Sequence, residues 1–277
     1  MSDNQISYKE QFSLKGKTAI ITGAAGILGK RFSSGLLELG ANVAMVDINE
    51  SLVKEVAAEL SKRYNATAIG IACDVSSVES VAKMVQIVIQ TFGQVTILHN
   101  NAATKSENLD AFFAPYEEYS LAEWRKINAV NIDGMFLVSQ AVGKQMVAQG
   151  KGGSIIQTAS IYGVLAPDQR IYKGSSYMGR PINTPAVYSV SKAAVIGLTQ
   201  YLATYWAQHG IRVNTLTPGG VESGQNEEFK RNYSNRIPLG RMAQDNEMVG
   251  ALLYLASDAS SYVTGQNIMV DGGLSVW

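Results

Sequence analysis

The stretch Thr18–Gly29, TAIITGAAGILG, sets an apolar run directly before glycines at positions 23, 26 and 29. An apolar run followed at once by a glycine-rich segment predicts a strand, a tight turn and a helix. Such a turn brings backbone N–H groups and a helix N-terminus up to a pyrophosphate, and side chains on the glycines would block that approach. The stretch therefore predicts the first βα unit of a dinucleotide-binding α/β protein.

An acidic residue at the end of the next strand would complete this pattern. Asp47 follows the apolar run 42–46 and lies 18 residues after Gly29 (47 − 29 = 18), close to the roughly 20 expected for a carboxylate that holds the adenosine ribose hydroxyls. Its charge would repel a 2′-phosphate, and the next residues, Ile48 and Asn49, supply no compensating Arg. The pattern predicts NAD rather than NADP as cofactor. The alternative is a structural helix cap followed by an ordinary strand-end Asp.

Strand-like apolar runs alternate with segments of helical period along the rest of the chain. The expected strands lie near residues 17–22, 42–47, 67–73, 95–100, 154–159, 211–216 and 267–270. This order implies parallel βαβ units with right-handed crossovers, so we predict an α/β fold with a single Rossmann-type doubly wound parallel sheet and helices on both faces. Ligands bind at the carboxyl ends of such strands, where we place Gly23, Asp47, Asp74, Asn100 and Ser160.

Composition limits the possible partners. With 277 residues, of which 46% are hydrophobic and 17% charged, the chain can bury a large core as one α/β domain. Lys+Arg and Asp+Glu number 23 each, so no overall basic field attracts nucleic acid or an anionic membrane. The partner that we expect is a small-molecule substrate.

Targeting and metal signals are weak. The single cysteine, Cys73, cannot form an internal disulfide, which fits a reducing compartment, and we expect a cytoplasmic protein. Residues 1–14 lack the apolar stretch of a signal peptide, so we interpret them as an N-terminal arm that precedes one domain over residues 15–277. His99 and His209 lie far apart without acidic or cysteine neighbours at ligand spacing, and we expect no metal site.

Tyr188 and Lys192 form the pair with the clearest chemistry. Positions i and i+4 share one face of a helix, so the Lys192 ammonium would favour the ionised phenol and lower the Tyr188 pKa from its usual value of about 10. A phenol tuned in this way can exchange a proton with an alcohol or ketone. The alternative is a pair that shares a helix face only for packing and solvation.

Taken in order, these motifs resemble the short-chain dehydrogenase/reductase family from about Lys17 to the C-terminus. Further matching motifs are Asp74-Val75, Asn100–Ala103 (NNAA), Val130–Gly134 (VNIDG), Pro218-Gly219, Val263–Gln266 (VTGQ) and Val270–Gly273 (VDGG). The resemblance implies a catalytic set of Asn131, Ser160, Tyr188 and Lys192. It implies cofactor contacts from Gly23, Gly26, Ile27, Leu28, Gly29, Asp47, Asp74, Val75, Asn101, Ala102, Tyr188, Lys192, Pro218, Gly219 and Val221.

The resemblance also implies a role for each catalytic residue. Tyr188 would act as general acid/base, and Ser160 would donate a hydrogen bond to the substrate oxygen, unless it only caps a strand end. Asn131 would bond a buried water that links Lys192 to solvent, unless it bonds its own backbone. Lys192 would also bond the nicotinamide ribose, unless it is a solvated helix cation. Asp74 has a second interpretation as part of a helix N-cap region.

The chain departs from the family pattern at two places in the cofactor motifs and at one loop. Ile27 stands where the short-chain branch usually carries its second glycine, and Ala103 replaces the glycine of the strand-end turn. Residues 161–187 form a connection of 27 residues between the expected serine and tyrosine, clearly longer than is usual for the family. Ordered loops longer than about 12–15 residues are uncommon and are often lids or binding loops.

We therefore interpret residues 161–187 as an inserted substrate loop. Its cations, among them Arg170 and Arg180, would bind a hydroxyl-rich or anionic substrate; the alternatives are an oligomer contact and a solvated excursion. Residues 104–120, with Phe112 and Phe113 near the centre, could form a second wall of the pocket or a satellite core.

Three classes of function are compatible with this pattern. The first is an NAD(H)-dependent oxidoreductase that acts on a secondary alcohol or ketone of a sugar, polyol, sugar phosphate or nucleotide sugar, with a 3-oxoacyl thioester as the second substrate class. The others are a nonredox epimerase or dehydratase that recycles bound NAD, and a catalytically silent nucleotide sensor. The resemblance further implies a homodimer or homotetramer formed through the helices that carry Asn131 and Tyr188.

Overall fold

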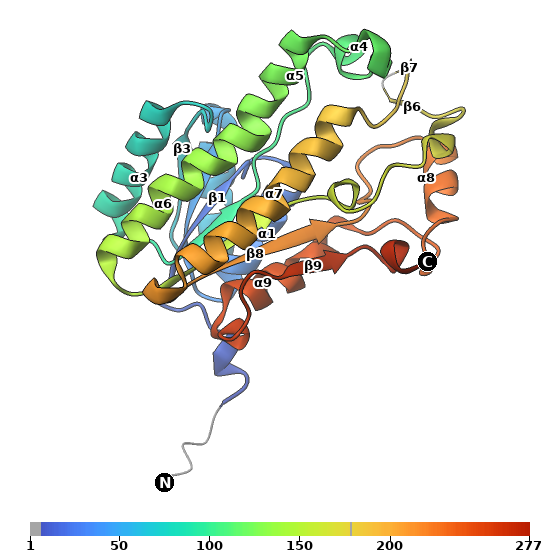
Figure 1. Ribbon diagram of the computed structural model, residues 1–277. Coiled ribbons are helices and arrows are strands. Elements are labelled where there is room, and N and C mark those ends of the chain that lie inside the picture. The colour runs from blue at the N-terminus through green and yellow to red at the C-terminus, as the bar shows by residue number, and fades with distance from the viewer. Residues whose placement is uncertain (1–6, 178) are drawn as a thin grey trace.

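The structure, a computed structural model, describes residues 7–177 and 179–277 and is built around one parallel sheet (Figure 1). The sheet contains seven strands in the order β3-β2-β1-β4-β5-β8-β9, and every neighbouring pair is parallel. The strands are β1 Thr18–Thr22, β2 Asn42–Asp47, β3 Ala68–Ala72, β4 Ile97–Asn100, β5 Gly153–Thr158, β8 Ile211–Pro218 and β9 Asn267–Val270.

Helices cover both faces of this sheet, so the predicted fold class is confirmed. The long helices are α1 Ile27–Glu38, α2 Glu50–Tyr64, α3 Val78–Phe92, α6 Met135–Gln149 and α7 Ala186–Tyr205; the shorter ones are α4 Leu109–Phe112, α5 Leu121–Asn128, α8 Glu227–Ser234 and α9 Val249–Ala256. Helices α1, α2 and α9 pack on one face, and α3, α6 and α7 on the other. In Figure 1 the second group lies in front of the sheet.

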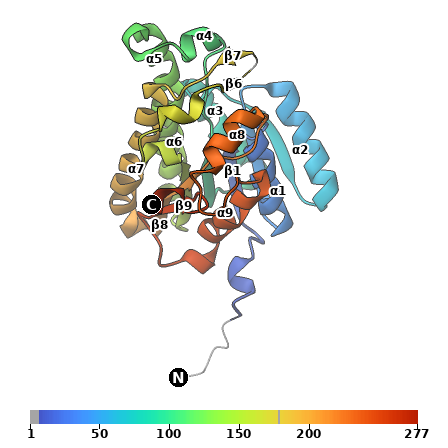
Figure 2. The ribbon, with the colours of Figure 1, turned by 90° about the vertical axis from the view of Figure 1, so that its right-hand side faces the viewer.

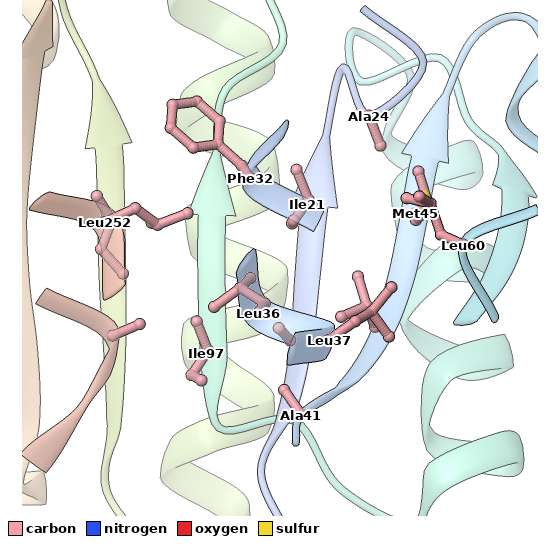
Figure 3. Close-up of a cluster of buried hydrophobic side chains, with 14 of the residues drawn as sticks. Ile21, Ala24, Phe32, Leu36, Leu37, Ala41, Met45, Leu60, Ile97 and Leu252 are labelled. Atoms are coloured by element: carbon pink, nitrogen blue, oxygen red, sulfur yellow. The ribbon is translucent and has the colours of Figure 1, made fainter. Parts of the chain in front are cut away.

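Burial on both faces explains why the strands are mostly apolar, although β5 and β8 also bury polar side chains such as Gln157 and Asn214. All five residues of β1 are buried, and consecutive side chains point to opposite faces: Ile21 belongs to the core under α1 and α2, and Ile20 to the core under α3 and α6. Figure 3 shows Phe32, Leu36 and Leu37 of α1 directed at the strands, in the core that lies under α1 and α2. Polar side chains that meet a ligand are therefore expected at the carboxyl ends of the strands.

Local signals fix where the helices begin and end. The Asn49 side chain accepts a hydrogen bond from the Leu52 backbone N–H at the start of α2, and Ser77 caps α3 in the same way. The C-cap of α2 is Asn65, which has φ 47°, and the C-cap of α3 is Gly93, which has φ 73°. Both residues adopt the left-handed conformation that commonly closes a helix.

Two strand boundaries differ from the sequence expectation for physical reasons. β4 begins at Ile97 rather than near residue 95, because the Val95 backbone N–H and C=O bond the side chain of Gln149 on α6, at 3.0 and 2.8 Å. β8 continues to Pro218, because it remains paired with β9 up to Val270.

Within residues 7–17, Leu14 anchors the N-terminal segment in the core under α1 and α2. Leu14 is fully buried, and its backbone N–H donates to the Leu39 carbonyl at 2.9 Å. Across residues 7–177 and 179–277, none of the helices combines the length and the apolar character needed to cross a membrane.

Leu36→Ala should lower the free energy of unfolding by about 2–5 kcal/mol, because it removes a fully buried side chain and leaves a cavity between α1 and the sheet. Leu121→Ala on α5, where the side chain is 59% exposed, is the matched control and should change it by less than about 1 kcal/mol. Urea unfolding followed by circular dichroism measures both. Equal losses in the two variants would contradict this description of the core.

Candidate active site

A cleft of ≈ 440 Å³ opens beyond the carboxyl ends of β4, β5 and β8. Three of the four expected catalytic residues, Ser160, Tyr188 and Lys192, line it, as do five further expected cofactor residues: Leu28, Asn101, Pro218, Gly219 and Val221. A larger cavity of ≈ 660 Å³, bordered by Tyr116, Tyr119 and Val164 among others, contains none of the expected catalytic residues. We therefore centre the candidate site on the smaller cleft.

The glycine-rich turn has the geometry that a nucleotide phosphate requires. Gly23 has φ +66°, and a Cβ on Gly29 would lie 2.2 Å from the Gly23 carbonyl oxygen, so both positions require glycine. Helix α1 begins at Ile27, and its N-cap, Gly26, offers no side chain to the first amide groups. These N–H groups and the helix dipole suit a pyrophosphate. Ile27, in the usual glycine position, is 53% exposed and does not crowd the turn.

The Thr22 side chain joins the end of β1 to the end of β4. Its Oγ1 accepts from the backbone N–H groups of Asn101 and Ala102, at 2.9 and 3.0 Å, and donates to Asn100 Oδ1 at 3.2 Å. Asn101 Nδ2 also donates to the Thr22 carbonyl at 3.1 Å. A Cβ on Gly23 would lie 3.0 Å from Ala102 Cα, so the two strand-end turns are in close contact.

The Asp47 carboxylate lies at the end of β2 beside this turn. It accepts from the backbone N–H of Ala25 at 3.0 Å and of Asn49 at 3.1 Å, which leaves further lone pairs for hydroxyl groups of a ligand. Arg31, which could have balanced a 2′-phosphate, pairs instead with Asp245 at 2.9 Å. The residues present therefore fit an adenosine ribose that carries free hydroxyls.

Asp74 and Val75 follow β3. The exposed Asp74 carboxylate accepts from the Ser76 backbone N–H and hydroxyl at 2.9 and 2.6 Å, which is a local turn, and the N-cap of α3 is Ser77 rather than Asp74. Val75 is buried, and a Cβ on Gly134 would meet its side chain at 2.8 Å.

The sequence expectation for the Tyr188 pKa is wrong in this structure. Burial raises the pKa of Tyr188, and the nearby Ser160 hydroxyl acts against this rise. The Lys192 ammonium lies 6.0 Å from the centroid of the Tyr188 ring and donates to the Thr158 carbonyl at 3.0 Å. The two residues do share a helix face, but the Lys192 ammonium is directed to the end of β5. Burial also makes the charged form of Lys192 less favourable and lowers its pKa to about 8.

Asn131 lies behind the cleft in a π-helical segment, η3 Ala129–Gly134, between α5 and α6. Its side chain is buried, and Oδ1 accepts from the Thr104 backbone N–H at 2.8 Å. Nδ2 lies 3.5 Å from the hydroxyl of Ser191, the neighbour of Lys192 on α7. Asn131 therefore connects α7 with the loop that follows β4, and it does not bond its own backbone in the way that the alternative interpretation supposed.

The connection 161–187 folds into short elements and packs against α8. It contains the 3-10 turns η4 Ile161–Gly163 and η5 Gln169–Tyr172 and the hairpin strands β6 Ser176–Tyr177 and β7 Arg180–Pro181. The Tyr172 ring stacks on Phe229 of α8 at 5.8 Å between centroids, and Phe229 stacks on Tyr233 at 5.5 Å. Figure 2 shows the hairpin between α4 and α8, at the end of the molecule far from the N-terminus.

This connection forms a wall of the cleft, but not through its arginines. The residues that line the cleft are Ile161, Tyr162, Tyr172, Tyr177, Ile182, Asn183, Thr184 and Pro185. Arg170 pairs with Asp168 at 2.8 Å and its side chain is 90% exposed, and Arg180 pairs with Asp110 at 3.2 Å. Neither arginine lines the cleft, so the expectation that they bind the substrate is wrong.

The loop 104–120 forms the facing wall. Phe112 and Phe113 both line the cleft, and Phe112 also packs in a small cluster with Ile127 and Val187, so both interpretations of these rings hold. Lys105 also lines the cleft and was missed at the level of sequence. The available signal was its position five residues after the end of β4.

Metal-ligating side chains do not cluster in the part of the chain that the structure describes: no group of three or more His, Cys, Asp or Glu could hold an ion there. Burial lowers the pKa of His99 to about 3, and its Nε2 lies 2.8 Å from the Thr158 hydroxyl. This histidine is therefore a neutral, fully buried residue of β4.

Comparison with known proteins identifies the family. The family model for short chain dehydrogenases matches residues 17–234. The D-threitol dehydrogenase of Mycolicibacterium smegmatis is 34% identical, with 98% of each chain covered.

Two solved structures have the same fold along nearly their whole length. A gluconate 5-dehydrogenase from Burkholderia cenocepacia, in complex with NADP and tartrate, superposes with a TM-score of 0.84 at 32% identity, covering 97% of this chain and 98% of that one. A short chain dehydrogenase from Leptospira borgpetersenii with bound NAD⁺ has a TM-score of 0.84 at 31% identity, covering 100% and 99%. The chain belongs to the short-chain dehydrogenase/reductase family, as an NAD(P)-dependent oxidoreductase that acts on CH–OH groups.

Proposed function

We propose that the protein is an NAD(H)-dependent oxidoreductase that interconverts a secondary alcohol and a ketone on a sugar- or polyol-type carbon chain. The observation that carries this proposal is the meeting of Ser160, Tyr188 and Lys192 with Leu28 and Asn101 in one cleft. When bound there, the nicotinamide supplies the hydride for reduction or takes it in oxidation. The names of the similar threitol and gluconate dehydrogenases point to hydroxylated chains as substrates.

Tyr188 carries the proton in this proposal. In oxidation the substrate carbon would give up a hydride to the nicotinamide, and its hydroxyl would give up a proton to Tyr188 in the phenolate form; in reduction the protonated phenol would give that proton to the ketone oxygen. Because burial raises the pKa of Tyr188, the phenol holds its proton at neutral pH, which suits proton donation to a ketone. The Ser160 hydroxyl would donate a hydrogen bond to the same oxygen as charge develops on it.

In this proposal Lys192 and Asn131 position the groups around the reacting atoms. Thr158 takes one of the three donors of the Lys192 ammonium, which leaves two for the Tyr188 phenolate and the nicotinamide ribose. Asn131 acts as a positioning residue in our proposal, because its carboxamide fixes the Thr104 backbone and contacts Ser191.

The Asp47 carboxylate supports NAD over NADP. No arginine follows it, and the nearby Arg31 already pairs with Asp245. A 2′-phosphate would therefore meet a like charge. The remaining expected cofactor contacts, including Asp74 near the adenine and Gly219 near the nicotinamide, are part of the same proposal.

We also propose a homodimer or homotetramer in which copies of the chain meet through α6 and α7. The outer face of these helices exposes three aromatic side chains, at 47% for Phe136, 62% for Tyr201 and 59% for Tyr205. An apolar patch of this kind on a helix pair is typical of protein–protein contacts. Light scattering or analytical sedimentation measures the oligomeric state directly.

Tyr188→Phe should lower kcat by roughly 10²- to 10⁴-fold, because it removes the hydroxyl that exchanges the proton. The dissociation constant for NADH, measured by fluorescence, should change by less than about threefold, because the ring and its packing remain. Tyr262→Phe, at a fully exposed tyrosine that does not line the cleft, is the matched control. Wild-type turnover in the Tyr188→Phe variant would rule out the proposed proton carrier.

Asp47→Asn should lower the ratio of kcat/KM for NAD to kcat/KM for NADP by roughly 10- to 100-fold, because it removes a charge that repels the 2′-phosphate. Asp258→Asn, on an exposed residue that pairs with Lys17, is the control and should leave the ratio unchanged. A wild-type enzyme that already prefers NADP would refute the proposed cofactor preference.

The buried Lys192 should make stability depend on pH. Its pKa is lowered to about 8 from 10.5, so between these values the unfolded chain binds the proton more tightly and stability rises with pH. The free energy of unfolding of the wild type, compared with that of Lys192→Met, should gain on the order of 1 kcal/mol per pH unit across this window. Urea titrations at both ends of it measure the difference, and identical pH slopes would contradict the lowered pKa.

A further inference from the structure

The charges in the cleft are few and of one sign. Among the described residues that line it, Lys105 and Lys192 are the only ones that carry a formal charge at neutral pH, and no Asp, Glu, Arg or His is present. Lys192 belongs to the proposed catalytic set. Lys105 therefore brings a positive charge into the cleft that no lining group balances.

The backbone around Lys105 is held firmly in place. The N–H of the preceding Thr104 donates to the buried Asn131 carboxamide at 2.8 Å, and the Thr104 hydroxyl donates to the Lys105 carbonyl at 2.7 Å. The following residue, Ser106, is buried and accepts from the Asn108 backbone N–H at 3.1 Å. The chain thus fixes the point from which the lysine side chain enters the cleft.

The Lys105 side chain reaches from one wall of the cleft to the other. Its ammonium lies 5.1 Å from the ring centroid of Tyr177, on the hairpin of the opposite wall. The ring face attracts the cation but offers no lone pair, so, as far as residues 7–177 and 179–277 are concerned, all three N–H donors remain for water or a ligand. None of the salt bridges formed within residues 7–177 and 179–277 includes Lys105.

The surroundings of this ammonium favour an anionic ligand. Water reaches Lys105 through the open cleft, but the protein packed around it desolvates the charge and lowers the pKa of Lys105. A ligand that closes over the cleft would remove more water, and the charge would then need an opposite charge beside it. A neutral polyol cannot provide that charge.

We propose that Lys105 binds the anionic end of the substrate, a carboxylate or a phosphate, and selects hydroxylated chains with such an end over neutral polyols. This inference rests on the proposed oxidoreductase function and adds the residue that sets its substrate class. The arginines of the insertion cannot take this role, because Arg170 and Arg180 pair with Asp168 and Asp110 outside the cleft.

The test compares three six-carbon substrates that differ in their end groups: D-gluconate, with a carboxylate at C1; D-glucitol 6-phosphate, with a phosphate at C6; and neutral D-glucitol. For the wild type, kcat/KM should be higher for an anionic substrate than for D-glucitol, and the better of the two anions identifies the end group. Lys105→Met should lower the ratio of anionic to neutral kcat/KM by roughly 10- to 100-fold, mostly through KM, because it removes a charge-assisted contact.

Two control variants separate charge from packing. Lys105→Arg keeps the charge and should retain most of the ratio. Lys173→Met makes the same side-chain change at an exposed lysine of the insertion that does not line the cleft, and should leave the ratio unchanged. Calorimetry measures binding of D-gluconate or the phosphate ester to the enzyme–NADH complex. This complex lacks the oxidised cofactor, so the bound substrate is not turned over. The affinity should fall in Lys105→Met, and it should fall in the wild type when salt is added.

The possible failures are distinguishable. A wild type that prefers D-glucitol, or a ratio that Lys105→Met leaves unchanged, would overturn the role of Lys105, while Tyr188-dependent turnover of the polyol would still uphold the proposed function. Absence of NAD-linked turnover with all three substrates, and with the wider series of polyols and sugar acids, would overturn the proposed function itself.

Discussion

The parallel pairing of β1 with both β2 and β4 is the constraint on which the rest of the structure depends. It aligns the carboxyl ends of the strands along one edge, where ligands bind in sheets of this kind, while burial on both faces makes the strands mostly apolar. Polar residues from distant parts of the sequence therefore collect at that edge. The Thr22 hydroxyl secures it, because one oxygen joins the glycine-rich turn to the turn that follows β4.

Much of this arrangement follows from local patterns in the sequence. Apolar runs of strand length, caps such as Asn49 and Ser77, and the glycines at 23 and 29 act within a few residues of where they stand, so they predict the elements and their order. Once the order is known, the rule that ligands bind at the carboxyl ends of parallel strands brings Ser160, Tyr188 and Lys192 to one cleft.

The properties that sequence did not predict depend on which neighbours each side chain meets in the fold, whether near or far along the chain. The i, i+4 spacing placed Lys192 near Tyr188, but the carbonyl of Thr158 directs its ammonium, and burial sets both pKa values. Arg170 was expected to meet a ligand and instead meets a carboxylate two residues before it. Lys105 had no motif to mark it, and only the fold shows that it enters the cleft opposite Tyr177.

The π-helical segment between α5 and α6 has a consequence for how this site could change over evolution. A π turn holds about one residue more than an α turn, so α6 is rotated out of phase with α5 by roughly a quarter of a turn or more. Deleting a single residue from Ala129–Gly134 would restore a continuous α-helix, but it would carry Asn131 away from Thr104. The loop after β4 would then lose the hydrogen bond that anchors Thr104. The number of residues in the π-helical segment therefore constrains the position of the loop that carries Lys105.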